Sequence, residues 1–260
     1  MGETAVHFTY RHVPGTRPPV MLLPGLVGAD WFWRSTIECL TARGFSTIAW
    51  DTPIAKLDRP LATSIEALRR ETIALLEDLG IDRAILCGSS LGALVALDVA
   101  GSHPERVAAL IASGSPGMHE GVVDLDYLLD HTDRETLERY GSRLFYTQPD
   151  SIDPALVDET IEMVLHRPTA VKILRAFQAA RSYDTVGLLP RVTCPVRLIW
   201  GEQDLITPLD NWRPHLSRLP DAELHVIAGC GHAPMVEQPA EWLRLTEEFA
   251  ERVAGTPAAA

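Results

Sequence analysis

The amino-acid sequence predicts an α/β fold: a mostly parallel sheet with helices on both faces and an inserted helical cap. Short apolar runs alternate with amphipathic helical patterns from residue 20 to residue 112, and the alternation resumes at residue 196. Regular alternation of this kind favours a parallel sheet, because each crossover helix packs on one face of it. Residues 20–23 contain no polar side chain, which is typical of a strand buried on both faces.

The strands and helices are expected in a regular order along the chain. Residues 63–79 place apolar side chains at helical spacing, and Gly80 then ends the helix. Gly44 ends an earlier helix in the same way. The expected strands are residues 7–13, 20–23, 46–50, 84–87, 107–112, 196–200 and 223–227, and the expected helices are residues 33–43, 63–79, 93–101, 210–217 and 240–253.

The alternation stops between residues 117 and 190. This stretch has mostly helical patterns, is rich in aromatic and charged residues, and is interrupted by Pro149, Pro154 and Pro168. Because a simple connection of this length is unusual, we interpret residues 117–190 as a helical cap inserted into a core formed by residues 1–116 and 191–260. The alternative is that these are ordinary surface helices of the same domain.

Length, charge and cysteine content limit the class of protein. The chain has 260 residues, is 46% hydrophobic and carries a formal net charge of -12. This charge disfavours nucleic acid and anionic membrane surfaces as partners, since both require basic patches; a neutral or weakly charged small-molecule substrate fits better. The sequence contains no signal-peptide pattern or membrane-length apolar run, and its four cysteines form no C-x-x-C pair. We therefore expect a cytoplasmic protein without a metal site, and the oligomeric state is left open.

A candidate nucleophile lies in the turn Gly-Ser-Ser-Leu-Gly at residues 88–92, between a short apolar strand and a helix. In a G-x-S-x-G turn the central serine sits at a sharp strand-to-helix reversal and projects its hydroxyl above the sheet. The central serine of this motif is Ser90. Ser89 is the alternative, but it lies off the centre of the frame.

A serine hydroxyl needs a base to remove its proton, and the base needs a carboxylate to orient it. Asp204 follows the expected strand 196–200 on a turn, and His232 follows the last expected strand on a glycine-flanked turn. The carboxyl ends of parallel strands meet at one edge of a sheet, so these residues can meet Ser90 there. Glu202, on the same turn as Asp204, is the alternative acid.

These motifs resemble the α/β-hydrolase family, whose triad runs Ser, Asp or Glu, then His along the chain. The resemblance extends from residue 10 to residue 253 and is carried by GSSLG at 88–92, GEQD at 201–204 and GHAP at 231–234. It implies the family fold, and it implies that Ser90, Asp204 and His232 form the triad. It also implies chemistry that requires no cofactor.

The resemblance further implies an oxyanion hole made by the backbone N–H groups of Leu91 and Leu26. The chain departs from the family at residues 24–25, where Pro-Gly replaces the usual His-Gly, and at residues 51–55, where members often carry a glycine-rich loop. Trp31 follows the oxyanion loop closely enough to line a pocket, and simple packing is the alternative.

Three functions are consistent with these motifs and with the family resemblance. The first is a serine hydrolase that cleaves a small carboxylic ester, lactone or thioester through an acyl-serine intermediate. The second uses the same triad for carbon–carbon bond hydrolysis, for elimination as a lyase, or for the peracid chemistry of cofactor-free haloperoxidases, all of which the resemblance includes. The third is a binding protein without turnover. An intact apparent triad favours an enzyme, and the substrate remains open.

Overall fold

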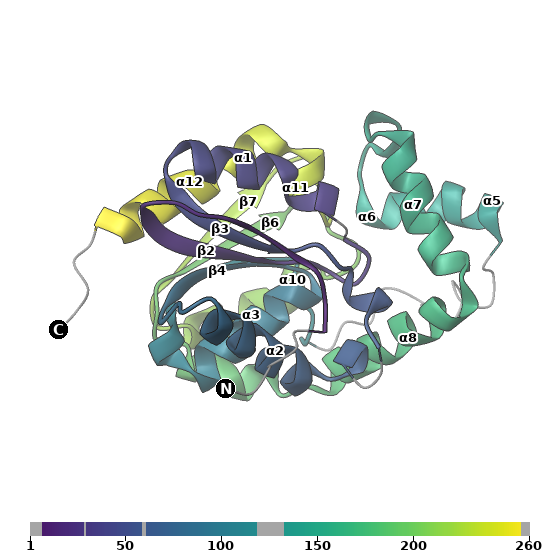
Figure 1. Ribbon diagram of the computed structural model, residues 1–260. Coiled ribbons are helices and arrows are strands. Elements are labelled where there is room, and N and C mark those ends of the chain that lie inside the picture. Colours follow the sequence, from purple (N-terminus) through teal and green to yellow (C-terminus); the bar gives the residue numbers. More distant parts are fainter. Residues whose placement is uncertain (1–6, 29, 59–60, 119–132, 256–260) are drawn as a thin grey trace.

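The computed structural model describes residues 7–28, 30–58, 61–118 and 133–255. Its strands form one sheet in the order β1-β3-β2-β4-β5-β6-β7, in which β1 runs antiparallel to β3 and every other neighbouring pair is parallel (Figure 1). The sheet therefore confirms the predicted fold class. The strands are β1 (Tyr10–Val13), β2 (Arg17–Leu23), β3 (Phe45–Trp50), β4 (Ala84–Ser89), β5 (Val107–Ser113), β6 (Val196–Gly201) and β7 (Ala222–Ile227).

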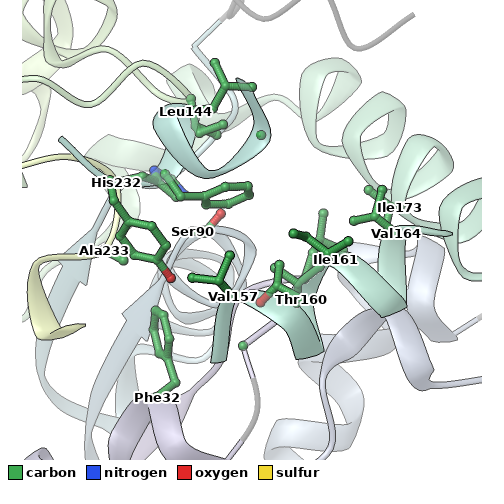
Figure 2. Close-up of a pocket in the computed structure, with 18 of the residues that line it drawn as sticks. Phe32, Ser90, Leu144, Val157, Thr160, Ile161, Val164, Ile173, His232 and Ala233 are labelled. Atoms are coloured by element: carbon green, nitrogen blue, oxygen red, sulfur yellow. The ribbon is translucent and has the colours of Figure 1, made fainter. Parts of the chain in front are cut away.

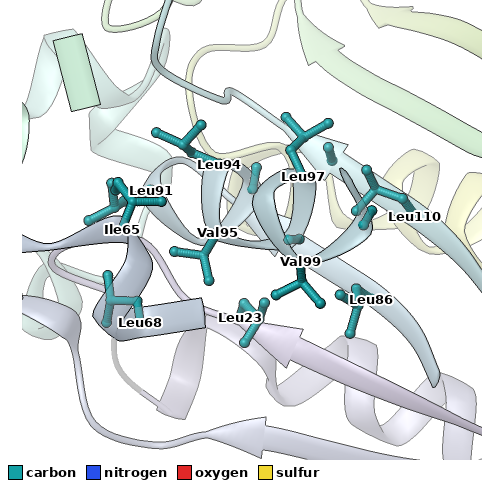
Figure 3. Close-up of a cluster of buried hydrophobic side chains, with 14 of the residues drawn as sticks. Leu23, Ile65, Leu68, Leu86, Leu91, Leu94, Val95, Leu97, Val99 and Leu110 are labelled. Carbon is teal, nitrogen blue, oxygen red and sulfur yellow. The ribbon is translucent and has the colours of Figure 1, made fainter. Parts of the chain in front are cut away.

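Helices cover both faces of the sheet (Figure 1). One hydrophobic cluster joins the sheet to α1 (Arg34–Ala42) and α12 (Pro239–Gly255). A second joins the opposite face to α2 (Ile65–Asp78) and α3 (Leu91–Ser102), and Figure 3 shows the α3 side chains packed against strand residues Leu23, Leu86 and Leu110. Within the described ranges, no helix combines the length and the apolar character needed to cross a bilayer.

The central helix α3 is buried on all sides. Each residue from Leu91 to Gly101 is buried, as expected for a helix whose apolar residues cover its whole circumference. Its one buried carboxylate, Asp98, is held by Arg69 at 2.8 Å and by the hydroxyl of Tyr183 at 2.5 Å. The helix that follows the candidate nucleophile is thereby fixed in the core.

One expected helix is shorter than the sequence pattern indicates. The pattern predicts a single helix over residues 210–217, but the α-helix α10 covers only Leu209–Trp212, and a 3-10 helix follows over Arg213–Arg218. Pro214 is the physical reason, because it has no N–H to donate to the carbonyl of Asp210 and its ring crowds that carbonyl.

The described part of the segment between β5 and β6 is helical and stands at one end of the sheet (Figure 1). It contains α5 (Arg134–Thr136), α6 (Ser142–Phe145), α7 (Pro154–Leu165), α8 (Arg167–Ser182) and α9 (Thr185–Leu188). We refer to these described helices as the cap. Residues 119–132 of the predicted cap lie outside the described part of the chain.

The cap is tied to the core at its α8 side. The hydroxyl of Tyr183, just after α8, donates to Asp98 of α3. The ammonium group of Lys172 donates to the carbonyl oxygen of Leu57 at 2.8 Å. These contacts, together with apolar packing of Ile173 and Ala176 into the core cluster, hold α8 against the sheet domain.

Candidate active site

Ser90 lies at the turn between β4 and α3, in a backbone conformation that side chains rarely adopt. Its φ is 53° and its ψ is -124°, and among the described residues other than glycine it alone has a positive φ. Such strain persists only where the surroundings enforce it, and it is common at functional sites. Here close packing enforces it, since a Cβ atom on Gly92 would lie 2.2 Å from the carbonyl oxygen of Leu23.

The loop after β2 lies directly against this turn. A Cβ atom on Gly25 would lie 3.2 Å from the Cβ of Ser90. The carbonyl of the next residue, Leu26, accepts a hydrogen bond from the N–H of Ala55 at 2.9 Å, so the segment that departs from the family pattern supports this loop. Among the described residues, the N–H groups of Leu26 and Leu91 have no backbone acceptor. Within the described chain, both donors are therefore left without a backbone partner.

Asp204 and His232 form a buried pair. The Nδ1 of His232 is 2.9 Å from Oδ2 and 3.0 Å from Oδ1 of Asp204, and both side chains are almost fully buried. Asp204 also accepts hydrogen bonds from the N–H groups of Ile206 and Thr207 and from the Thr207 hydroxyl. Because a carboxylate only accepts hydrogen bonds, this contact requires a proton on Nδ1, and in a neutral imidazole Nε2 is then the acceptor.

The Nε2 atom of His232 is buried and has no hydrogen-bond partner among the described residues. Ser90 and His232 both line the same cavity. Catalytic hydrogen bonds are often long in unliganded enzymes and tighten when substrate binds. An unpartnered nitrogen in this position is available to accept a proton within the cavity.

The structure places the residues that the sequence left as alternatives at different positions, although Ser89 and Ser90 both line the cavity. Glu202 is exposed, whereas Asp204 is buried against His232. Ser89 is a buried residue of β4 that pairs in register with Ser113, whereas Ser90 begins the turn. The structure thus brings together Asp204 and His232 beside the cavity that Ser90 lines, and it does not bring Glu202 there.

Gly114 is a site residue that sequence reasoning missed. It follows β5 with a φ of 58°, and a Cβ atom there would lie 2.8 Å from Cε1 of His232 and 3.3 Å from Oδ2 of Asp204. The only available signal was a glycine just after an expected strand. Its role depends on the packing of segments far apart in sequence.

The cap also contacts the histidine directly. The backbone N–H of His232 donates to the carbonyl of Phe145, at the end of α6, at 2.8 Å. The ring of Phe145 meets the imidazole edge-on, with centroids 5.8 Å apart. The backbone of His232 is therefore held by the cap rather than by the sheet.

A cavity of about 130 Å³ lies between the cap and the strand ends. Figure 2 shows Ser90 and His232 on one side, with Thr160, Ile161 and Val164 of α7 facing them. Trp31 also lines the cavity, and its indole N–H donates to Glu159 of α7 at 3.1 Å. Trp31 thus both lines the pocket and links the core to the cap.

Tyr146 is a buried residue that lines the cavity. Burial, reinforced by the nearby carboxylate of Glu237, raises the pKa of this phenol to about 12. It is therefore protonated and uncharged at neutral pH. Within the described part of the chain, no cluster of three acidic, histidine or cysteine side chains is arranged to hold a metal ion.

Comparison with known proteins identifies the family of the chain. A model of the alpha/beta hydrolase family matches residues 20–245. The chain belongs to this family. This alpha/beta hydrolase is 29% identical over 244 residues to a 2-hydroxy-6-oxononadienedioate/2-hydroxy-6-oxononatrienedioate hydrolase from Pseudomonas sp, covering 88% of this chain and 85% of the relative.

It is also 30% identical over 241 residues to a 2-hydroxy-6-oxo-6-phenylhexa-2,4-dienoate hydrolase from Comamonas testosteroni, covering 87% of this chain and 84% of the relative. Among solved structures it is similar to an alpha/beta hydrolase enzyme from the sediment metagenome of the Mar Chica lagoon, Morocco. That match has a TM-score of 0.72 and 28% sequence identity, and covers 97% of this chain and 96% of the other. Names of relatives and family membership together support a hydrolase.

Proposed function

We propose that this alpha/beta hydrolase is a serine hydrolase that cleaves a small carboxylic ester, lactone or thioester without a cofactor. The observation that carries the proposal is the hydrogen bonding of the two ring nitrogens of His232. Its Nδ1 is held by Asp204, while its Nε2 is buried without a partner among the described residues, beside the cavity that Ser90 lines. That is the arrangement a general base for a serine hydroxyl requires.

In this mechanism the Oγ of Ser90 attacks the substrate carbonyl carbon while His232 Nε2 takes the hydroxyl proton. The tetrahedral intermediate then collapses, and His232 gives the proton to the leaving alcohol or thiol. Water next attacks the acyl-Ser90 carbonyl, again with its proton taken by His232, and Ser90 leaves as a restored hydroxyl. Asp204 stabilises the imidazolium formed in each step and fixes its orientation.

The oxyanion of both tetrahedral intermediates would be held by the N–H groups of Leu26 and Leu91. The absence of backbone acceptors for these two donors among the described residues supports this assignment. A missing oxyanion-hole donor typically costs about 3 kcal/mol of transition-state stabilisation. The hydrogen bond from the N–H of Ala55 to the carbonyl of Leu26 should therefore affect the rate of hydrolysis as well as the structure of the loop.

We further propose residues 117–190 as the cap of this enzyme, with residues 1–116 and 191–260 as its core. The described cap residues supply one wall of the cavity, including Leu144, Phe145 and Val157. A lid of apolar side chains keeps bulk water from the acyl-enzyme and strengthens hydrogen bonds to the oxyanion.

Active-site labelling with a fluorophosphonate probe tests the serine mechanism. We expect intact-protein mass measurement to show one covalent adduct on the wild type and none on Ser90→Ala. Ser89→Ala is the matched control, because it removes the neighbouring hydroxyl and should keep the adduct. An adduct that persists on Ser90→Ala would refute Ser90 as the nucleophile.

Carbon–carbon bond hydrolysis is a second candidate, favoured by the names of the full-length relatives. The substrates named there are ketones that carry carboxylate groups, and their hydrolysis yields two carboxylic acids. Ester hydrolysis releases an alcohol instead. Product analysis by mass spectrometry, with Ser90→Ala as the blank, separates the two reactions.

A further inference from the structure

The walls of the cavity carry almost no charge. Among the described residues that line it, His232 is the one side chain with an imidazole, ammonium, guanidinium or carboxyl group. No lysine, arginine, aspartate or glutamate is found among these described lining residues. The wall opposite the site residues is made by apolar side chains of α7 and α8: Val157, Ile161, Val164, Ile173, Leu174 and Phe177.

Two of the polar groups on these walls already donate their hydrogen bonds to protein atoms. The hydroxyl of Thr160 donates to the carbonyl of Leu156 in its own helix at 3.1 Å. The indole N–H of Trp31 is taken by Glu159. Tyr146 is an uncharged phenol at neutral pH, because burial raises its pKa to about 12. None of them supplies a positive charge.

Two lysines close to the cavity are engaged elsewhere. Lys56 lies 3.8 Å from Glu159, and Lys172, next to Ile173, donates to the carbonyl of Leu57. On the outer side of the cap, Arg134 pairs with Glu138, Asp158 and Glu162. The chain as a whole carries a net charge of -12. An anionic substrate would therefore meet a protein of net negative charge and a cavity whose described lining residues include no lysine or arginine.

We propose that the site accepts substrates whose acyl group is uncharged and apolar, and that it discriminates against substrates with a carboxylate on that group. The proposal rests on the proposed function and narrows its substrate class. Transferring a carboxylate from water to an apolar site without a positive partner is strongly unfavourable. An alkyl or aryl chain of similar size gains free energy at the same position because it leaves water.

A pair of esters tests the proposal directly. The para-nitrophenyl ester of hexanoic acid and the mono-para-nitrophenyl ester of adipic acid have acyl chains of the same length, but the second chain ends in a carboxylate. After subtraction of the uncatalysed rates, we expect kcat/KM to be at least about 100-fold higher for the hexanoate, since an unpaired buried charge costs at least this factor. Ser90→Ala should hydrolyse neither ester.

Failure of this proposal can be distinguished from failure of the serine mechanism. Equal kcat/KM values for both esters, with both activities lost in Ser90→Ala, would overturn the substrate class and leave the mechanism standing. Turnover that survives in Ser90→Ala would overturn the mechanism. The substrate class is then decided by calorimetric binding of hexanamide and adipic acid monoamide to Ser90→Ala, where tighter binding of hexanamide supports it and equal binding overturns it.

A positive charge placed on the apolar wall should weaken the preference for the hexanoate ester over the adipate ester. Figure 2 shows Val164 and Ile173 away from Ser90, at the far side of the cavity. Ile173→Lys is expected to raise the adipate-to-hexanoate ratio of kcat/KM by about tenfold or more, as a partner for the terminal carboxylate becomes available. Gln178→Lys adds the same charge at an exposed position of the same helix and should leave the ratio unchanged. Equal ratios in the two variants would contradict the inference.

Discussion

The carboxylate of Glu237 accepts a hydrogen bond from the backbone N–H of Gly231 at 2.7 Å. Gly231 directly precedes His232, and the other oxygen of Glu237 accepts from the backbone N–H of Thr147 at 2.7 Å and from the Thr147 hydroxyl. The same side chain thus joins the histidine loop to the cap segment that follows α6. Glu237 is a positioning residue in the proposed mechanism, since it acts through the backbone that carries His232.

Glu237→Gln should lower kcat by about tenfold while changing KM little. The amide of glutamine would turn an N–H group toward the N–H of Gly231 or Thr147, and the loss of a hydrogen bond to a charged group costs about 1.5–3 kcal/mol. Hydrolysis of para-nitrophenyl hexanoate gives kcat and KM, and urea unfolding gives the stability. Glu241→Gln is the matched control, because Glu241 pairs with exposed Arg244 on the protein surface. Indistinguishable kinetics for the two variants would argue against a positioning role.

Asp204→Asn should leave the fold intact and lower kcat by about 10⁴-fold. An asparagine of the same shape no longer stabilises the imidazolium and favours the wrong tautomer of His232; in chymotrypsin-type triads the equivalent change has this effect. Glu202→Gln removes the exposed acid from the same turn and should keep the wild-type rate. Steady-state kinetics on both variants decides which of the two residues is the acid of the triad. Circular dichroism checks that both variants fold. A larger loss in Glu202→Gln would reverse the assignment of the acid.

Gly114→Ala should lower kcat by about 100-fold. The added Cβ would lie 2.8 Å from Cε1 of His232, so the ring must move, and displacement of a catalytic group by about 1 Å costs this factor. The alanine is also strained by the positive φ. Gly80→Ala isolates that cost, because Gly80 has a φ of 64° and, apart from its own stretch of backbone, no described residue has an atom within 4 Å of the point that its new methyl group would occupy. Gly80→Ala should lose about 1 kcal/mol of stability and keep its activity; equal activity in the two variants would show that the ring is not displaced.

The fold could be predicted, and a candidate for each of the three proposed catalytic groups could be named, because their signals are local. Ser90 stands in a glycine-flanked turn after an apolar strand, and Asp204 and His232 each follow a strand whose end must reach the same edge of a parallel sheet. The order of these residues along the chain then matches a known family. Pro214 is also a local signal, and the helix prediction over residues 210–217 is wrong because apolar spacing alone takes no account of the proline.

The supporting residues could not be predicted because their roles arise from contacts between distant segments. Gly114 matters only because β5 ends against the imidazole of His232. Glu237 matters because the segment after α6 returns to the loop before His232, a contact across ninety residues that no periodicity in the sequence records. The uncharged character of the cavity likewise depends on which faces of α7 and α8 turn inward.

Away from the site, Arg197 provides a link between β6, β7 and α12 that should make stability depend on pH. Its guanidinium is buried, donates to the carbonyl of Leu245 and pairs with Glu223 at 2.7 Å. Burial acts to raise the pKa of Glu223, but hydrogen bonds and charge from Arg197 and Arg252 outweigh it and lower that pKa to about 2. The carboxylate is therefore more easily ionised in the folded protein than in the unfolded chain.

A carboxyl group with a lowered folded-state pKa stabilises the fold above its unfolded pKa of about 4.3, and this stability is lost as the pH falls toward 2. Glu223→Gln should accordingly lower the free energy of unfolding at pH 7 by no more than about 1 kcal/mol, because Glu223 is partly exposed and solvent screens the pair. The difference from the wild type should shrink steadily below a pH of about 4.

Urea unfolding across this pH range measures the difference in stability. Ester hydrolysis at neutral pH should be unchanged, since Glu223 is not among the described residues that line the cavity. A difference that stays constant down to low pH would mean that ionisation of Glu223 does not stabilise the fold.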